Sequence, residues 1–202
     1  MRQLFSDPLR ELLRRRSVLF ALAGSNGSGK TSFYRAYLRK SQLPFVNADQ
    51  LAMQTNVDVY KAAKLADDLR RNLLEERRSF IFETVFSDPV GDKLAFLKEA
   101  ESAGYTVVLL FVGIASPELS DLRVTMRVSK GGHDVPAHKI VERYARTIAN
   151  LKSALCELRH VIVYDNSELD RPYRIVAVKQ PDTGLKIVSE IPEWLRAVLP
   201  SS

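Results

Sequence analysis

The sequence has 202 residues, and its 30 lysines and arginines outnumber its 24 aspartates and glutamates, which gives a net charge of +6. This length favours a single domain over residues 1–202. The sequence contains no apolar run of the roughly 20 residues that cross a bilayer, and its single cysteine, Cys156, excludes an internal disulfide. We therefore expect a cytoplasmic protein, with Cys156 as a small core residue on a helix.

The predicted elements begin with a basic helix that Ser6-Asp7-Pro8 caps and that carries five arginines between positions 2 and 16. A short apolar run at 17–23 follows, as expected for a buried parallel strand. Residues 24–31 then read GSNGSGKT, and helical spacing begins at Ser32. The order of strand, glycine-rich turn and helix is typical of a phosphate-binding P-loop, whose consensus is G-x-x-x-x-G-K-[ST].

The residue types of this loop suit a triphosphate. Its glycines allow a tight turn whose N–H groups converge on the phosphates, Lys30 reaches the β- and γ-phosphates, and the Thr31 hydroxyl can ligate Mg²⁺. We therefore expect ATP and Mg²⁺ as cofactors, with Thr31 as the metal ligand. The predicted nucleotide-binding residues are Gly24, Ser25, Asn26, Gly27, Ser28, Gly29, Lys30, Thr31 and Ser32.

After this loop, apolar strands alternate with amphipathic helices. The strands are predicted at 44–49, 79–85, 105–113 and 160–165, the helices at 57–78, 88–103, from Pro117 to Gly131-Gly132 and at 136–158, and a hairpin at 173–188 precedes a helix near Trp194. On helix 57–78 we expect an apolar face that includes Tyr60, Leu65 and Leu69. Strands separated by helices predict an α/β fold, with a parallel sheet of the P-loop kinase type and helices on both faces.

Two other classes of nucleotide-binding protein are disfavoured. A GTPase needs an Asn-Lys-x-Asp motif to read its base, and the sequence has none. Asp88 in Asp88-Pro-Val-Gly91 is better explained as a helix cap than as part of a GTPase switch. A dinucleotide-binding fold needs Gly-x-Gly-x-x-Gly, which is also missing.

Two acidic residues follow predicted strands, at the edge where parallel strands open onto a ligand crevice. Asp49 can accept the proton of a substrate hydroxyl that attacks the γ-phosphate, and it can equally cap the helix that follows. Glu83 comes after three apolar residues, and burying it is costly without a purpose. It is either a residue beside Mg²⁺, a substrate anchor or one half of a buried ion pair.

The segment 123–146 is rich in arginine and lysine and contains Gly131-Gly132. Two basic helices joined by a glycine-containing loop are typical of a lid that closes over ATP and places arginines on the γ-phosphate. A charged stretch is also typical of a solvent-exposed helix face. We place the predicted helical lid at about 117–146.

Taken together, these segments resemble one known family, the zeta-toxin-like P-loop kinases, from about Val18 to Asn166. The segments that carry the resemblance are GSNGSGKTS, Asn47-Ala48-Asp49, Phe82-Glu83-Thr84, the pattern from Arg127 through Gly131-Gly132-His133 to Arg143-Tyr144, and Asn150-Leu151. Well-studied members of this family are bacterial toxins that phosphorylate a hydroxyl of UDP-N-acetylglucosamine.

The resemblance implies an ATP-dependent kinase whose acceptor is an alcohol group of a nucleotide sugar or similar metabolite. It implies catalytic roles for Lys30, Asp49, Arg127 and Arg143, with Asp49 as the general base. It also implies that Asp49, Glu83 and Thr84 contact the substrate, and it admits an antitoxin protein as a partner. The best-known toxins have a further arginine shortly after the Glu-Thr pair, whereas Val85-Phe86-Ser87 stands here, so the identity of the acceptor carries over less directly.

Two alternative functions stay open at this point. One is a polynucleotide or nucleoside kinase, which only the basic N-terminal segment favours. No aromatic residues are interleaved with the basic clusters, so we do not expect a nucleic acid as the partner. The other is a non-catalytic nucleotide-binding switch, which would need no base such as Asp49.

Overall fold

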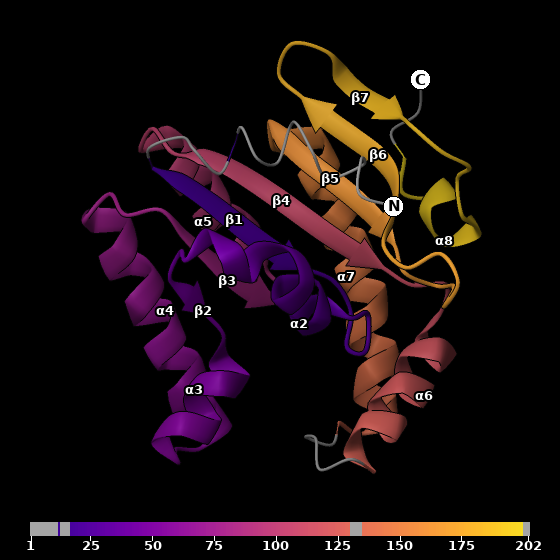
Figure 1. The fold of residues 1–202 in the computed structure, drawn as a ribbon, viewed down its shortest axis with the longest axis horizontal. Helices are drawn as coiled ribbons and strands as arrows, with labels where there is room; N and C mark the ends of the chain where they lie inside the picture. The colour runs from indigo at the N-terminus through magenta and orange to yellow at the C-terminus, as the bar shows by residue number, and fades with distance from the viewer. Residues whose placement is uncertain (1–11, 13–16, 130–134, 200–202) are drawn as a thin grey trace.

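The computed structural model describes residue 12 and residues 17–129 and 135–199 (Figure 1). In this part of the chain, seven strands form one sheet in the order β2-β3-β1-β4-β5-β6-β7. The first five are parallel, and β6 and β7 extend the β5 edge as an antiparallel hairpin. The strands are β1 Val18–Ala23, β2 Phe45–Val46, β3 Phe80–Thr84, β4 Thr106–Gly113, β5 His160–Asp165, β6 Arg174–Gln180 and β7 Gly184–Ile187.

The helices lie between these strands, as the alternating pattern predicted. They are α2 Lys30–Phe33, which continues as a π-helix over Tyr34–Leu38 and a 3₁₀ turn over Arg39–Ser41, then α3 Ala48–Thr55, α4 Val59–Glu75, α5 Asp92–Ser102, α6 Pro117–Val128, α7 Ala137–Glu157 and α8 Glu193–Arg196. The predicted α/β fold is confirmed. None of the helices in the described ranges is long and apolar enough to span a membrane.

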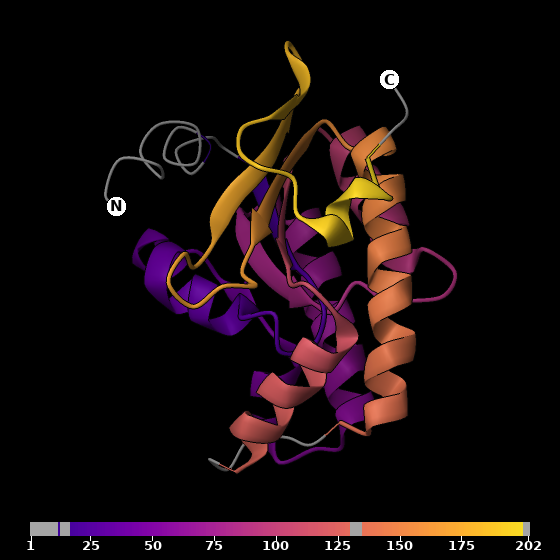
Figure 2. The ribbon, with the colours of Figure 1, turned by 90° about the vertical axis from the view of Figure 1, so that its right-hand side faces the viewer.

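Alternating side chains of β1 enter two separate apolar layers, because successive residues of a strand face opposite sides of the sheet. Leu19, Ala21 and Ala23 belong to the layer that α4, α5, α7 and α8 cover. Val18, Phe20 and Leu22 belong to the layer that the α2 segment covers. Figure 2 shows α2 and α7 on opposite sides of the sheet, so the prediction of helices on both faces is confirmed.

The register of the parallel strands brings three separate segments to one edge of the sheet. Leu22 pairs with Glu83 and Ala23 with Thr84, so the end of β3 lies beside the start of the P-loop. Val46 of β2 pairs with Phe82, which places the next residues of both strands side by side.

The second predicted strand is shorter than expected. β2 ends at Val46, and Asp49 lies in the first turn of α3 instead of at the end of a strand. The helix cap is Asn47, whose Oδ1 accepts a hydrogen bond from Gln50 N at 3.1 Å. The alternative interpretation of Asp49 as the N-cap is therefore wrong. Asn47, two residues earlier, has the extended backbone that an N-cap requires.

The expected apolar face of α4 is only partly confirmed, because Leu73 and Leu74 pack into the core whereas other predicted members do not. Tyr60 is 84% exposed and Leu65 is 45% exposed, whereas the buried residues of the helix include Ala62, Ala66 and Arg70. The small side chains of Ala62 and Ala66 thus let the helix pack closely against the sheet. They also leave space for the buried side chain of Arg70.

Some predicted features fall elsewhere or cannot be located. Cys156 is exposed on α7 and is not a core residue. The basic N-terminal helix, apart from the buried Leu12, and the loop with Gly131-Gly132 lie outside the described residues. The helices α6 and α7 are both present on either side of that loop, as predicted.

Candidate active site

The P-loop has a backbone that only glycine adopts readily. Gly24 and Gly27 have φ angles of +145° and +70°. A Cβ atom on Gly24 would lie 2.1 Å from Val112 O, and one on Gly27 would lie 2.7 Å from Ser120 O. Both positions combine a positive φ with a close approach of another backbone, so the glycine spacing is a steric requirement of this turn.

Three side chains from distant segments hold the P-loop by donating hydrogen bonds to its carbonyl groups. The bonds run from Ser120 Oγ to Asn26 O, from Asn166 Nδ2 to Ser28 O at 2.8 Å, and from Tyr173 OH to Gly29 O at 3.0 Å. Arg123 in turn donates to Asn166 O at 2.8 Å. The sequence analysis did not predict any of these four residues for the site. Asn166 directly follows β5, and it could have been predicted because parallel strands end at the ligand crevice, as argued for Asp49.

The side chain of Lys30 is buried against the backbone of the P-loop. Its Nζ donates to Gly24 O and to Ser25 O, both at 2.9 Å. Burial lowers the pKa of Lys30, and the nearby carboxylates of Glu83 and Asp49 counteract part of that shift. The ammonium group therefore sits in a desolvated position, where its attraction for an incoming anion is strong.

Glu83 meets the P-loop at Thr31. The Thr31 hydroxyl lies 3.1 and 3.0 Å from the two carboxylate oxygens of Glu83 and donates to this carboxylate. Burial raises the pKa of Glu83, while Lys30, Thr31 and the Asn47 side chain each stabilise its charged form. Asn47 thus both caps α3 and hydrogen-bonds Glu83, which fixes the end of β3 relative to β2.

The oxygen atoms of Thr31 and Glu83 fit the donor set that Mg²⁺ prefers. Mg²⁺ in phosphoryl-transfer enzymes is usually held by one or two protein oxygens together with substrate phosphates and water. The described residues contain no group of three or more His, Cys, Asp and Glu side chains that could hold a metal ion.

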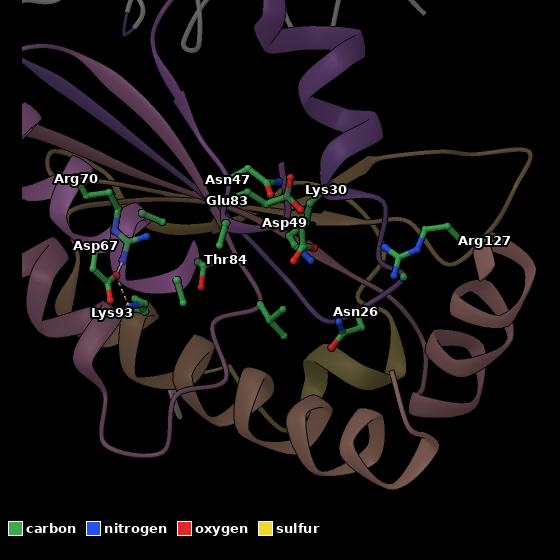
Figure 3. A pocket seen from close by; sticks show the side chains of 15 residues that line it. Asn26, Lys30, Asn47, Asp49, Asp67, Arg70, Glu83, Thr84, Lys93 and Arg127 are labelled. Atoms are coloured by element: carbon green, nitrogen blue, oxygen red, sulfur yellow. Dashed lines mark hydrogen bonds and ion pairs between the residues drawn. The ribbon is translucent and has the colours of Figure 1, made fainter. Parts of the chain in front are cut away.

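A cavity of about 200 Å³ lies beside these groups (Figure 3). It brings together most of the predicted catalytic and substrate-binding residues, from four different parts of the chain. Those that line it are Lys30, Asp49, Glu83, Thr84 and Arg127, and Asn26 and Gly27 of the predicted nucleotide-binding loop line it as well. We call this the inner cavity.

A larger cavity of about 980 Å³ adjoins the inner one and shares Asn47, Asp49 and Arg127 with it. We call it the outer cavity. Thr31 and Ser32 of the P-loop line it, together with α3, α6 and the loop that follows β5. Part of its wall is aliphatic and is formed by Met53, Leu119, Leu122, Met126 and Leu169, and Arg35, Arg123 and Arg127 are among the polar residues that line the rest.

Arg143 is placed differently from Arg127. It lies half-buried on α7 and is not among the described residues that line either cavity. The following turns of α7 hold the segment after β3 instead. Thr147 Oγ1 donates to Val85 O at 2.9 Å, and Asn150 Nδ2 donates to Phe86 O at 2.9 Å.

Three further residues of the inner cavity escaped sequence reasoning, namely Asp67, Arg70 and Lys93. Asp67 and Arg70 come from α4, and Lys93 comes from α5. In Figure 3 they lie at one end of the cavity, Arg127 lies at the other, and Lys30, Asp49 and Glu83 lie between.

A P-loop between β1 and α2, on a parallel sheet of order β2-β3-β1-β4-β5, defines the P-loop kinase class of α/β proteins. Within this class, the sequence model of the zeta toxin family matches residues 48–176, and the chain belongs to that family. The resemblance seen in the motifs is thereby confirmed. Family and fold together support a nucleotide-dependent phosphotransferase.

The chain is also similar to particular proteins. An uncharacterized protein of Haemophilus influenzae is 28% identical over 127 residues, which are 60% of this chain and 88% of that protein. A chain of the AvrRxo1-ORF1:AvrRxo1-ORF2 complex is 19% identical with a TM-score of 0.66, and the match covers 89% of this chain and 64% of that one. Another structure of that complex contains ATP.

A structure of the PezAT toxin-antitoxin system of Streptococcus pneumoniae is 20% identical with a TM-score of 0.59, and the match covers 84% of this chain and 77% of that chain. At identities of 19–20%, these likenesses establish the fold. This chain spans less than two thirds of the AvrRxo1 complex chain that it matches.

Proposed function

We propose that the protein is a kinase that transfers the γ-phosphate of ATP to a hydroxyl of a small molecule, and that a nucleotide sugar such as UDP-N-acetylglucosamine is the first acceptor to test. One observation carries this proposal: the P-loop lysine Lys30, the carboxylate of Asp49 and the guanidinium of Arg127 line one cavity (Figure 3). A protein that only binds a nucleotide needs no carboxylate beside its γ-phosphate.

The outer cavity is the proposed site of the nucleoside. It borders Thr31 and Ser32, and its volume of about 980 Å³ and its aliphatic wall suit a base and ribose. The triphosphate would then extend along the P-loop into the inner cavity. There Lys30 would exchange its two bonds to loop carbonyls for bonds to the β- and γ-phosphates.

Thr31 and Glu83 are the residues that would hold Mg²⁺, and the ion supplies charge neutralisation at the β- and γ-phosphates. The hydrogen bond between their side chains keeps both oxygens at the mouth of the P-loop. Burial raises the pKa of Glu83 and so favours its neutral form, and a cation beside this carboxylate would counteract that shift.

Asp49 is the proposed general base. The acceptor oxygen forms a bond to the γ-phosphorus as Asp49 takes the hydroxyl proton, and the bond from this phosphorus to the β–γ bridging oxygen breaks, so ADP leaves with that electron pair. Arg127 is proposed to neutralise charge on the transferred group. Arg143 is proposed to do the same once the lid at about 117–146 closes. We treat residues 1–202 as one kinase domain that includes this lid.

The substitution Asp49→Asn tests the proposal. We expect it to keep the shape of the site and the affinity for ATP but to remove the proton acceptor, which lowers transfer by about 10²–10⁴-fold. The measurement is single-turnover transfer from γ-labelled ATP, at saturating ATP and Mg²⁺, to a panel that contains UDP-N-acetylglucosamine, other metabolites and oligonucleotides. Asp68→Asn, at an exposed position of α4, is the matched control.

Three outcomes would contradict parts of the proposal. Transfer by Asp49→Asn within a few-fold of wild type would leave Asp49 as an ordinary residue of the first helical turn. Transfer to oligonucleotides alone would make the protein a polynucleotide kinase. Binding of ATP without transfer to any acceptor would make it a nucleotide-binding switch.

We also propose an antitoxin protein as a partner. Support comes from family membership and from the toxin-antitoxin system among the similar structures. An antitoxin that blocks the outer cavity would weaken binding of a fluorescent ATP analogue, and competition between the two is the measurement that checks it.

A further inference from the structure

The chain has no regular secondary structure directly after β3, and side chains of α7 hold its backbone there. We call this stretch, residues 85–88, the β3 exit segment. Asn150 Nδ2 donates a hydrogen bond to Phe86 O at 2.9 Å and another to Asp88 O at 3.0 Å. A side-chain amide carries two N–H donors, so this one amide group bridges two carbonyl groups of the segment.

Two other side chains of α7 bind the same segment. Arg146 Nε donates to Ser87 O at 2.8 Å. The buried hydroxyl of Thr147 lies 2.9 Å from Val85 O and 2.8 Å from Arg143 O, so its single proton is shared between these two carbonyl groups. All four carbonyl groups of the β3 exit segment thus lie within hydrogen-bond distance of donors on one helix.

The backbone of Phe86 has a strained conformation. Its φ angle is +61°, in the left-handed region that bulky residues rarely occupy, and its side chain is buried in the core. Such a conformation persists only where the surrounding structure enforces it, and it is typical of residues that shape a functional site. Here the constraint comes from the buried ring and from the amide of Asn150 on the backbone of Phe86 and Asp88.

The turn at Phe86 restricts the direction of the Thr84 hydroxyl. Phe86 N donates to Thr84 Oγ1 at 3.0 Å, so this oxygen already accepts a hydrogen bond from the backbone. A hydroxyl group can also donate its own proton. Because Thr84 lines the inner cavity (Figure 3), that proton is a donor for a molecule bound there.

We propose that Asn150 is a positioning residue of the acceptor site, which holds the turn at Phe86 and thereby aims the Thr84 hydroxyl at the acceptor. This inference rests on the proposed function, because it takes the predicted contact of Thr84 with the acceptor as given. We call the end of the inner cavity beside β3 the acceptor end. Asn150 is not among the described residues that line either cavity, so it acts through Thr84.

A purely structural role is the alternative explanation for Asn150. Its two hydrogen bonds also join α7 to the β3 exit segment, and removing them leaves carbonyl groups unsatisfied, which destabilises a protein by itself. A loss of stability is therefore common to both explanations. Only the positioning role connects Asn150 to the Thr84 side chain and, through it, to one of the two substrates.

The first experiment observes the Thr84 side chain without catalysis. Threonine methyl groups are labelled with ¹³C, and NMR spectra of wild type are compared with those of Asn150→Leu, which has a similar size but no donors. We expect the Thr84 methyl signal to shift, while that of Thr106 at the start of β4 stays in place. The matched control is Asn72→Leu, at an exposed position of α4, which should leave the Thr84 signal unchanged.

An unchanged Thr84 signal in Asn150→Leu would overturn the inference. If this variant does not fold, Asn150→Gln replaces it, since the longer side chain displaces the same two donors. The same criterion then applies to the Thr84 signal of Asn150→Gln.

The second experiment is a double-mutant cycle in the transfer assay, with UDP-N-acetylglucosamine as the first acceptor and the remaining panel after it. We expect Asn150→Leu and Thr84→Val each to raise the KM for the acceptor about tenfold, as for loss of one hydrogen bond. The Kd for ATP should change by about twofold at most. The double variant should resemble Thr84→Val, because both substitutions remove the same contact. Thr84→Ser keeps the hydroxyl and should retain a KM near that of wild type.

Effects on KM that multiply in the double variant would overturn the positioning role, since they would mean that Asn150 and Thr84 act independently. A rise in the Kd for ATP equal to the rise in KM would also overturn it, because it would indicate a general defect of the fold.

The two proposals fail in different ways. If Asn150→Leu shifts the Thr84 signal but wild type phosphorylates no acceptor, the control of Thr84 by Asn150 stands and the proposed function fails. If wild type phosphorylates an acceptor, and Asn150→Leu changes neither the Thr84 signal nor the KM, the kinase function stands and the positioning role is overturned.

Discussion

The two ends of the inner cavity are built by different means. At the nucleotide end, one continuous segment from Gly24 to Ser32 supplies the P-loop, and side chains from three distant segments bind its carbonyl groups. At the other end, single side chains from α4, α5 and the end of β3 meet around Asp67, whose carboxylate pairs with both Arg70 and Lys93. The P-loop end requires a fixed local sequence, whereas the other end requires only that side chains of distant segments pack together. The proposed ATP site is therefore tied to a local motif, whereas the opposite end of the cavity depends on contacts between distant segments.

The largest expected effect is at the nucleotide end, with Lys30→Met. Removing the cation beside the β- and γ-phosphates should lower transfer by about 10³-fold or more and also weaken ATP binding, because both depend on this charge. The loss should be the same for every acceptor. Rates of γ-phosphate transfer and the Kd for ATP check this.

The exposed Lys40→Met is the matched control for Lys30→Met, since it removes the same type of charge near the same helix. Thermal stability should not fall in Lys30→Met, because burial lowers the pKa of Lys30 and its charged form is costly to bury. Turnover close to that of wild type would mean that this loop does not bind the transferred phosphate.

A smaller effect is expected from Arg127, which lies at the opposite end of the cavity from Arg70. Arg127→Ala should lower kcat by about 10²-fold and change the Kd for ATP only a few-fold, as for a contact made mainly in the transition state. If the lid closes, Arg143→Ala should also lower kcat strongly and change the Kd for ATP only a few-fold. Steady-state kinetics and ATP titration measure the two quantities, with the exposed Lys139→Ala as control.

An arginine with a purely structural role would give a different result. Arg127→Ala or Arg143→Ala would then unfold at a lower temperature but would keep its turnover per folded molecule. A loss of kcat in Arg127→Ala that varies with the acceptor would contradict the proposed difference between the two ends of the cavity, because it would place Arg127 at the acceptor end.

The smallest expected effect is on stability and concerns Glu83, between the two ends. Burial raises its pKa above the ordinary value of 4.5, so the folded protein holds this proton more tightly than the unfolded chain. The stability that Glu83 contributes is thus fully present below about pH 4.5 and is lost as the pH rises through the folded pKa. Wild type should lose stability relative to Glu83→Gln as the pH rises from 4.5 towards neutrality.

Thermal unfolding of wild type and Glu83→Gln between pH 4 and pH 8 measures this difference, and the exposed Glu75→Gln is the control. A difference that grows in favour of wild type with rising pH would show that the attraction between Glu83 and the nearby charge of Lys30 outweighs burial.

The sequence by itself determined the elements whose cause is local. The positive φ angles of Gly24 and Gly27 follow from the tight turn of the P-loop, and the apolar runs predict the strands on either side of it. The rule that parallel strands end at a ligand crevice also predicted that Glu83 would reach the site, and Asp49 reaches it from the first turn of α3. These features depend on a few neighbouring residues, so they can be read from the chain.

Only the tertiary structure decided features that depend on contacts between distant segments. The packing of α4 on the sheet buries Ala62, Ala66 and Arg70 and leaves Tyr60 exposed, although periodicity placed Tyr60 on the apolar face. Arg70 is tolerated inside because Phe82 and Phe96 approach it from two other elements and Asp67 neutralises part of its charge. Hydrophobic periodicity counts an arginine as polar, so no pattern along α4 could place this residue in the cavity.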